Sequence, residues 1–264
     1  PFLNQTKQLV DVLVHQLAFA HPVDPEPMTC IVHSPNGYDA EICSHLFTGG
    51  EVCRDVIIVG FLLLQEHLSI VPLDFVIVDQ FIDRTFAREK SFFGTGCVAH
   101  VSVAHPTCPR LSDACETAAR AAGINTHRGG TYLAMEGPQF STLAESKMYR
   151  ESWGADVIGM TNMPEAKLAR EAELCYASVA MITDYDSWHP DHGEVDVTQI
   201  IQTLMGNADK GRDLVKRLPA LLGADRAPCE HGCDRALEFA ILTAPEARDP
   251  AVMAKLDAVA GRLL

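Results

Sequence analysis

The chain has 264 residues, which is long enough to bury the core of one large α/β domain or of two smaller ones. Its formal net charge of −14 argues against nucleic acid or an anionic membrane surface as the main partner. Its nine cysteines, an odd number in a chain this long, indicate reduced thiols and a cytoplasmic location rather than a disulfide framework.

Residues 1–73 differ in composition from the rest of the chain. They contain one lysine and one arginine, whereas the remaining residues contain nineteen. Apolar spacing around residues 9–17 predicts a helix, and the run from Asp55 to Leu64 predicts a strand. No apolar run approaches the ~18 residues of a membrane span, and polar residues interrupt the stretch near the N-terminus. We therefore predict neither a membrane span nor a signal peptide.

From Asp74 onward, predicted strands and helices alternate. The apolar runs predict buried strands at residues 75–78, 126–136, 155–160 and 175–183. Helical patterns are predicted near residues 111–122, 142–154, 235–242 and 250–263, and from Pro164 and Val197 onward. Residues 80–96 are predicted to form a long loop. This alternation predicts an α/β fold, with a single domain over residues 1–264 and a central mixed, twisted sheet flanked by helices.

Three local signals refine the predicted boundaries. Gly123 follows the first of these helices as its stop. Thr142 and Glu145 have the spacing of a capping box, which opens the second helix. Gly129-Gly130, inside a predicted strand, marks a bulge or a close backbone approach.

Two carboxylates follow the strand predicted at residues 175–183, namely Asp184 and Asp186. In open α/β folds, ligands bind in the crevice outside the carboxyl ends of the strands. Residues 136–140 and 159–161 lie at the ends of two other predicted strands, and we expect them to meet the two acids. The three strand ends together are the predicted ligand site.

The residues at these strand ends suit a purine. Phe140 and Met160 offer apolar surfaces on which a planar ring can stack. An ionised carboxylate accepts a hydrogen bond from an amino group at the purine edge, whereas a protonated carboxyl can donate to a ring nitrogen as the purine departs. Taken without their neighbours, the two acids could equally form a polar loop after a core strand, and Phe140 and Met160 could be core residues.

Four motifs lie between residues 74 and 220 in a fixed order and spacing. They are Val78-Asp-Gln-Phe-Ile-Asp-Arg-Thr85, Glu136-Gly-Pro-Gln-Phe140, Ala155-Asp-Val-Ile-Gly-Met-Thr161 with Met163-Pro-Glu165, and Thr183-Asp-Tyr-Asp-Ser-Trp188. In these motifs the chain resembles the purine nucleoside phosphorylase superfamily and, within it, the 5′-methylthioadenosine phosphorylases. Residues 1–73 do not share the resemblance.

The resemblance implies a nucleoside phosphorylase-like fold and the phosphorolysis of 5′-methylthioadenosine to adenine and 5-methylthioribose 1-phosphate. Inorganic phosphate would be the co-substrate, and neither a metal nor an organic cofactor is implied. The expected partners are a purine nucleoside and phosphate, without nucleic acid or membrane. The expected assembly is a homotrimer.

The resemblance also implies roles for individual residues. Asp184 would contact N7 of the purine and donate its proton, and Asp186 would read the 6-amino group or support that contact. Phe140 would stack on the base, and Met160 would pack under the ribose. Thr161 would contribute to phosphate binding.

Three further residues are implied near the sugar. Val197 and Ile200 would line the pocket for the 5′-methylthio group, although both lie on an amphipathic helix and could equally pack in the core. His100 matches a histidine that reaches a neighbouring subunit's site in family trimers. An ordinary surface position is the alternative for this histidine.

Residues 1–73 lack three segments that family members carry: a Gly-Gly-Ser-Gly-like loop, an Arg-His-Gly turn and an Ala-x-Gly-Ser segment. These segments bind most of the phosphate in the family. Either this part of the chain diverged, or it was replaced, or it does not represent the native segment. Three other functions therefore stay open: a phosphorylase of 6-oxopurine nucleosides, a phosphate-independent nucleosidase, and a non-catalytic purine-binding relative.

The remaining polar signals are interpreted as structural. An ion-pair or loop-anchoring group is expected at Asp79, Asp83 and Arg84. Asp156 is expected to anchor its strand. Cys229 and Cys233 enclose a histidine but lack the second half of a zinc site, so a surface loop is favoured there over a metal site.

Overall fold

The computed structural model describes residues 29–32, 55–64, 70–189, 197–223 and 227–264. Within these residues the strands are β1 Thr29–Val32, β2 Asp55–Leu64, β3 Phe75–Val78, β4 Gln80–Arg84, β5 Thr126–Arg128, β6 Thr131–Met135, β7 Val157–Gly159 and β8 Cys175–Tyr185. The α-helices are α3 Pro109–Ala121, α4 Leu143–Glu151, α5 Glu165–Glu171, α6 Val197–Leu222 and α7 Pro250–Ala260. Short 3-10 helices are η1 Cys233–Arg235 and η2 Pro245–Ala247. The helix predicted around residues 9–17 lies outside the described residues.

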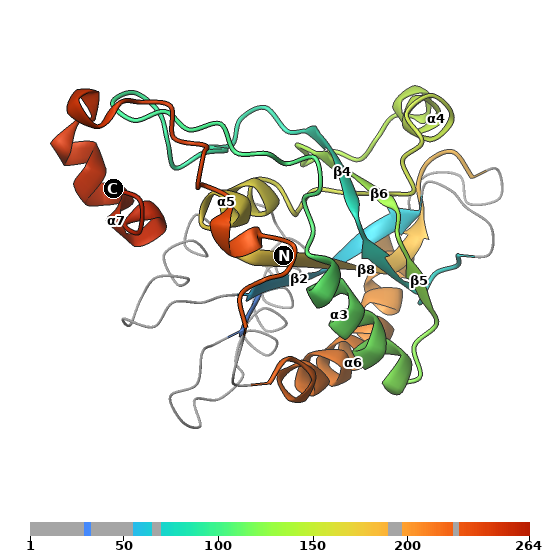
Figure 1. Ribbon diagram of the computed structural model, residues 1–264. Coiled ribbons are helices and arrows are strands. Elements are labelled where there is room, and N and C mark those ends of the chain that lie inside the picture. Colours follow the sequence, from blue (N-terminus) through green and yellow to red (C-terminus); the bar gives the residue numbers. More distant parts are fainter. Residues whose placement is uncertain (1–28, 33–54, 65–69, 190–196, 224–226) are drawn as a thin grey trace, which may run out of the picture.

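The described strands form one mixed sheet in the order β4-β6-β7-β2-β8-β3-β5, with β1 paired to β2 (Figure 1). β8 lies near its centre, parallel to β2 on one side and antiparallel to β3 on the other. β2 is antiparallel to β7, which in turn is parallel to β6. The α/β fold with a mixed sheet flanked by helices is therefore confirmed.

Two chain segments, residues 75–84 and 126–135, each contribute strands to both ends of this sheet. Each segment bends where its first strand passes into its second. β3 and β4 are separated by Asp79 alone, and β5 and β6 by Gly129-Gly130. β3 pairs with β5 at one end of the sheet, whereas β4 pairs with β6 at the other. The amide of Asp79 donates to the carbonyl of Gly130 over 3.2 Å, and the amide of Gly130 donates to Asp79 Oδ1 over 3.1 Å. The bend thus carries its own hydrogen bonds.

The bend explains two errors of the sequence prediction. Residues 80–84 form β4 rather than the start of a long loop, and the strand predicted at 126–136 is divided in two. Gly129 and Gly130 have φ values of 85° and 141°, which side chains disfavour. A Cβ atom on Gly129 would also lie 3.1 Å from Asp79 Oδ2. The close backbone approach predicted for the glycine pair is confirmed.

β8 is buried on both faces, as its unbroken apolar sequence predicts. Its odd-numbered residues Ala177, Val179 and Met181 belong to a core cluster with residues of α3 and α6. Its even-numbered residues Tyr176 and Ala180 belong to a second cluster with residues of α5. Helices therefore cover the sheet on two sides (Figure 1). Fully burying one such large apolar side chain stabilises the fold by roughly 1.5–3 kcal/mol.

Most predicted helices are confirmed, with small shifts at their ends. The capping box is present at α4, where Thr142 and Glu145 bond each other's backbone amides. Gly123 follows α3 with φ +72°, as expected of a helix stop. Pro164 lies just before α5 rather than inside its first turn. Among the described helices, none is long and apolar enough to cross a membrane.

The helix predicted at residues 235–242 is wrong. The 3-10 helix η1 is followed by turns up to Ala240, and the chain then runs beside residues 98–100. The amide of Leu242 donates to the carbonyl of Val98, and the amide of His100 donates to the carbonyl of Ala240. These long-range backbone bonds end the local turns at Ala240 and hold the chain in an extended form there. The segment then leads through η2 to α7, which lies at one end of the molecule beyond α5 (Figure 1).

Candidate active site

The loop after β6 is in contact with the end of β7. A Cβ atom on Gly137 would lie 2.6 Å from the sulfur of Met160, so these two residues touch closely. The backbone amide of Thr161 donates to the hydroxyl of Tyr132 over 3.1 Å, and the two hydroxyl oxygens are 3.3 Å apart. Two of the three predicted strand ends, those of β6 and β7, are therefore brought together.

The same loop also contacts the segment that follows β8. The hydroxyl of Ser187 donates to the carbonyl of Ser141 over 3.0 Å. The guanidinium of Arg150, in α4, lies 3.9 Å from the ring centre of Trp188, which is a favourable cation–π distance. The loop after β6 thus lies between the other two strand ends and contacts both.

Asp184 and Asp186 are both withdrawn from solvent. Asp184 is 5% exposed and Asp186 is 1% exposed. Asp184 is paired with Leu63 of β2, and its carboxylate accepts a hydrogen bond from the amide of Tyr185 over 2.8 Å. Acidic residues are rarely buried to this extent in proteins unless a partner or a ligand compensates them.

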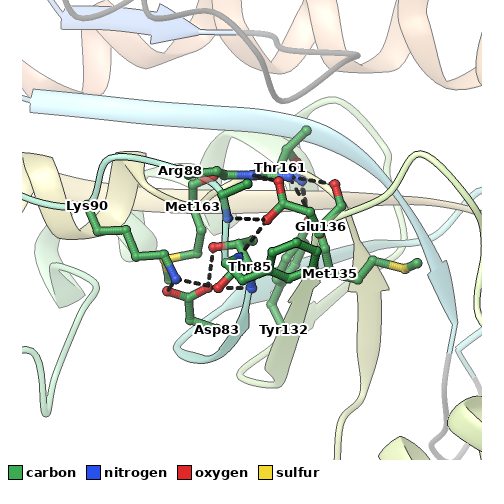
Figure 2. Close-up of polar contacts among 11 residues, drawn as sticks. Asp83, Thr85, Arg88, Lys90, Tyr132, Met135, Glu136, Thr161 and Met163 are labelled. Carbon is green, nitrogen blue, oxygen red and sulfur yellow. Dashed lines mark hydrogen bonds and ion pairs between the residues drawn. The ribbon is translucent and has the colours of Figure 1, made fainter.

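Arg88 and Glu136 form a nearly buried ion pair beside the end of β6 (Figure 2). Glu136 Oε2 accepts hydrogen bonds from the amides of Phe86 and Ala87, at 2.7 and 3.2 Å, and Oε1 accepts one from Arg88 Nε at 3.3 Å. Desolvation works against ionisation of Glu136, but these donors outweigh it and lower the pKa of the carboxyl. Arg88 also donates to the carbonyls of Glu136 and Met163, which links the loops after β6 and β7.

Asp83 anchors a second ionic group at the end of β4 (Figure 2). Its Oδ2 contacts the ammonium groups of Lys90, at 2.9 Å, and Lys167, and its Oδ1 accepts from the hydroxyl of Thr85 at 2.6 Å. Burial opposes the charge, yet the hydrogen bonds from Lys167, Thr85 and Lys90 hold the pKa of Asp83 well below its usual range. The interpretation of Asp83 as an ion-pairing anchor is confirmed.

The other anchoring residues also have structural partners. Asp79 binds the amide of Gly130 at the bend, and Arg84 stacks over the ring of Trp153 at 5.3 Å. Asp156 accepts a hydrogen bond from the amide of Thr131 over 2.7 Å and so fixes the start of β6. These contacts confirm that the acids anchor the backbone.

A buried polar network lies behind Thr161. Asn162 donates to the hydroxyl of Ser178 over 2.8 Å and accepts from that of Tyr176 over 3.2 Å, which ties the end of β7 to β8. Burial raises the pKa of Tyr132 and of Tyr176 well above the usual value, so both phenols stay neutral and serve as hydrogen-bonding groups. Because its own hydroxyl and amide bind Tyr132, Thr161 is held in one position.

The remaining predicted site residues have different surroundings. Phe140 is 43% exposed in the loop after β6. His100 is exposed, and its backbone pairs with the C-terminal segment at Ala240 rather than with the strand ends. Val197 and Ile200 lie in the first turn of α6, where the structure describes the backbone only.

Sequence reasoning missed Arg88, Tyr132 and Asn162, which position the loops of the candidate site. Arg88 is 48 residues from Glu136 in the chain, so no local pattern announces their pairing. Tyr132 lies in the apolar strand β6 and Asn162 in the loop after β7, and at both positions the sequence predicts simple packing. The one available signal is the placement of Glu136 directly after a buried strand, where a charge requires a partner.

Comparison with known proteins identifies the family. A sequence profile of the phosphorylase superfamily matches residues 63–219. The S-methyl-5′-thioadenosine phosphorylase of Cereibacter sphaeroides is 74% identical over 193 residues, which is 73% of this chain and 66% of that protein. The chain thus spans slightly less than two thirds of the length of this relative.

Two solved structures have the same fold. A methylthioadenosine phosphorylase from an antarctic soil metagenomic library is 42% identical, with a TM-score of 0.72 over 78% of this chain and 71% of that chain. The methylthioadenosine phosphorylase of Schistosoma mansoni, solved in complex with adenine, is 31% identical, with a TM-score of 0.62 over 66% of this chain and 67% of that chain. The chain belongs to the phosphorylase superfamily and, within it, to the methylthioadenosine phosphorylase family.

Proposed function

We propose that the protein cleaves 5′-methylthioadenosine with inorganic phosphate, giving adenine and 5-methylthioribose 1-phosphate. The observation that carries this proposal is the pair of buried carboxylates, Asp184 and Asp186, at the end of β8. The loop after β6 contacts Ser187, which follows these acids, and also Met160 at the end of β7, and these contacts support a shared site. The relatives named above supply the choice of nucleoside.

In the proposed reaction the bond between the purine N9 and C1′ of the ribose breaks, and a bond between a phosphate oxygen and C1′ forms. The electron pair of the broken bond passes to the purine, which leaves as neutral adenine once N7 has received a proton. Asp184 supplies or directs that proton, and Asp186 accepts a hydrogen bond from the 6-amino group. A general acid of this kind accelerates a reaction typically about 10²–10⁴-fold.

The base and the ribose are assigned to two apolar side chains. Phe140, with 43% of its surface exposed, is accessible for stacking on adenine. Met160, half-buried and held against Gly137, packs under the ribose. The adenine bound in the Schistosoma mansoni relative supports a site for this base.

The phosphate and the 5′ group are assigned by family motif. Thr161 binds phosphate from a fixed position, because Tyr132 holds both its amide and its hydroxyl. Val197 and Ile200 line the apolar pocket for the 5′-methylthio group. The segments that bind most of the phosphate in the family have no counterpart by motif in residues 1–73. No metal or organic cofactor is needed for this chemistry.

The protein is further proposed to act as a cytoplasmic homotrimer. His100 then reaches the sugar in a neighbouring subunit's site. Support for this role comes from the exposure of His100, whose side chain is available to a second subunit. Six described cysteines are free thiols, which suits a reducing compartment.

Adenine release from 5′-methylthioadenosine tests the proposal, measured with and without phosphate. Wild-type release should require phosphate, and Asp184→Asn should lower kcat/KM about 10²–10⁴-fold. Asp186→Asn should also weaken binding of 6-amino nucleosides relative to inosine. Asp209→Asn, at an exposed carboxylate of α6, is the matched control and should retain wild-type turnover.

Each of the other functions predicts a different result. Release that is indifferent to phosphate would identify a nucleosidase, and a clear preference for inosine would identify a 6-oxopurine phosphorylase. Binding of adenine without turnover of any nucleoside would identify a non-catalytic relative. An unchanged rate in Asp184→Asn would remove the acid from the mechanism.

A further inference from the structure

Four cysteine side chains from three separate parts of the chain meet in one place. Cys108 immediately precedes α3, Cys175 is the first residue of β8, and Cys229 and Cys233 flank a turn beyond α6. All four are buried free thiols, and their sulfur atoms all lie within 4.8 Å of one another. The expectation of a surface loop at Cys229 and Cys233 is therefore wrong.

The spacing of the sulfur atoms suits a single tetrahedral ion. The sulfurs of Cys108 and Cys229 are 3.8 Å apart. Bonds of about 2.3 Å from zinc to four thiolates at tetrahedral angles place neighbouring sulfurs about 3.8 Å apart. A disulfide would need about 2.05 Å. An iron–sulfur cluster with several irons would hold its outer thiolates farther apart than this group allows.

The backbone around the second pair is arranged to present both sulfurs to the same point. The amide of Gly232 donates to the carbonyl of Cys229 over 2.9 Å and closes a turn, in which Gly232 has φ +69°. The carboxylate of Asp234 accepts a hydrogen bond from the amide of Cys229 over 3.2 Å. A short Cys-x₃-Cys turn with a left-handed glycine suits one half of a four-cysteine zinc site.

Two arginines offset the charge that such a site would carry. Four thiolates and one divalent cation leave a net charge of −2. Arg110 donates to the sulfur of Cys175 over 3.5 Å, and Arg170 lines the same cavity as Cys233. Partners of this kind orient the ligands and reduce the cost of a buried negative centre.

We propose that Cys108, Cys175, Cys229 and Cys233 bind one Zn²⁺ ion in a structural site. Binding would replace four S–H protons by one cation and involves no redox change. Because four protein ligands leave no open position, the ion would stabilise the fold rather than catalyse a reaction. It would join the segment after α6 to α3 and to β8, the strand that carries Asp184 near its end.

A cavity adjoins the cluster on the side of Cys233. A cavity of about 390 Å³ opens next to the cluster, and its lining includes His105, Arg170, His231 and Cys233. We expect an ion or a small chelator to reach the cluster from this cavity. Exchange of the metal should therefore be possible in the folded protein.

The first test measures metal in the full chain, purified without a polyhistidine tag from cells grown with added zinc. Elemental analysis should find about one zinc per chain. After removal of zinc, loading with Co²⁺ should produce the visible bands and the thiolate-to-metal charge-transfer band of tetrahedral sulfur ligation. Absence of both zinc and these bands would overturn the proposal, as would stoichiometric iron or a disulfide among the four cysteines found by mass spectrometry.

The second test uses variants matched for residue type and burial. The zinc content of Cys229→Ala and of Cys233→Ala should be lower than that of the wild type by a factor of about ten or more. Cys115→Ala, at a buried thiol of α3 outside the cluster, should retain zinc fully. A chelator should lower the melting temperature of the wild type and of Cys115→Ala. Full zinc content in Cys233→Ala would overturn the proposal, and if that variant fails to fold, the wild-type Co²⁺ spectrum decides.

Discussion

At the scale of single residues, Glu136 has a positioning role that its motif does not reveal. Its side chain is 9% exposed and that of Arg88 is 5% exposed, so the pair is shielded from water. The carboxylate binds two consecutive amides as well as the guanidinium. Through Arg88 it holds the carbonyl of Met163, and with it the loop that follows Met160 and Thr161. The pair therefore fixes two of the three segments of the candidate active site.

The charge of Glu136 should make the free energy of unfolding depend on pH in the acidic range. The folded-state pKa of Glu136 is lowered, so its contribution is present above the unfolded pKa of about 4.3 and is lost as pH falls through the folded pKa. Glu136→Gln should therefore lower the free energy of unfolding by about 2 kcal/mol at pH 7 and by less as the pH falls below about 4. Urea unfolding monitored by circular dichroism across this range measures both values.

The control for this experiment is Glu246→Gln, at an exposed carboxylate of η2. Its unfolding free energy should follow the wild-type curve at every pH, because the side chain has no buried environment to lose. A Glu136→Gln deficit that stays as large at about pH 3 as at pH 7 would contradict the electrostatic argument. The deficit would then reflect packing rather than charge.

At the scale of elements, the sequence predicted those features that neighbouring residues determine. The capping box at Thr142, the stop at Gly123 and the apolar run of β8 all depend on contacts within a few residues, and all three are present. The bend at Asp79 depends on a glycine pair fifty residues later, so residues 80–84 were wrongly assigned to a loop. Local patterns do not contain such pairings.

The same limit applies to the candidate site and the cysteine cluster. The segments that carry the acids, Phe140, Met160 and Thr161 could be located from motifs, because each motif follows a strand. The pairing of Arg88 with Glu136 could not be found this way, since 48 residues separate them. The cluster of four thiols combines Cys108 and Cys175 with a pair near the C-terminus, and only the fold brings these sulfurs together.

Helix α4 offers a test of one local element. The hydroxyl of Thr142 accepts from the amide of Glu145 over 3.2 Å, and α4 follows directly after the loop that carries Phe140. Thr142→Ala should lower the free energy of unfolding by about 1 kcal/mol, and Thr142→Ser should restore most of it. Thermal unfolding of the three proteins provides the measurement.

Thr117→Ala in α3 is the matched control for the cap. The hydroxyl of Thr117 donates to the carbonyl of Asp113 within the helix, a bond that adds little because the helix already uses that carbonyl. This variant should therefore be as stable as the wild type, or slightly more stable. If Thr142→Ala and Thr117→Ala lower the free energy of unfolding equally, the capping hydrogen bond contributes no more to stability than the hydrogen bond within α3.

At the scale of the whole molecule, the proposed site is incomplete in a single subunit. His100 is exposed and belongs to a segment that pairs with the C-terminal residues near Ala240. Its proposed role near the sugar therefore requires a second copy of the chain. In a closed trimer, each site would combine Asp184 of one subunit with His100 of its neighbour.

Mixed oligomers distinguish a shared site from one built within a single subunit. Asp184→Asn and His100→Ala should each have low activity as homotrimers. When they are co-expressed at equal levels, about one quarter of the sites should contain both an intact Asp184 and an intact neighbouring His100. The mixed preparation should then release adenine several-fold faster than the average of the two parents. Native mass spectrometry shows whether mixed trimers have formed. If they have and the rate still equals the average of the parents, His100 does not act across the interface, because recombination of intact residues would have restored the site.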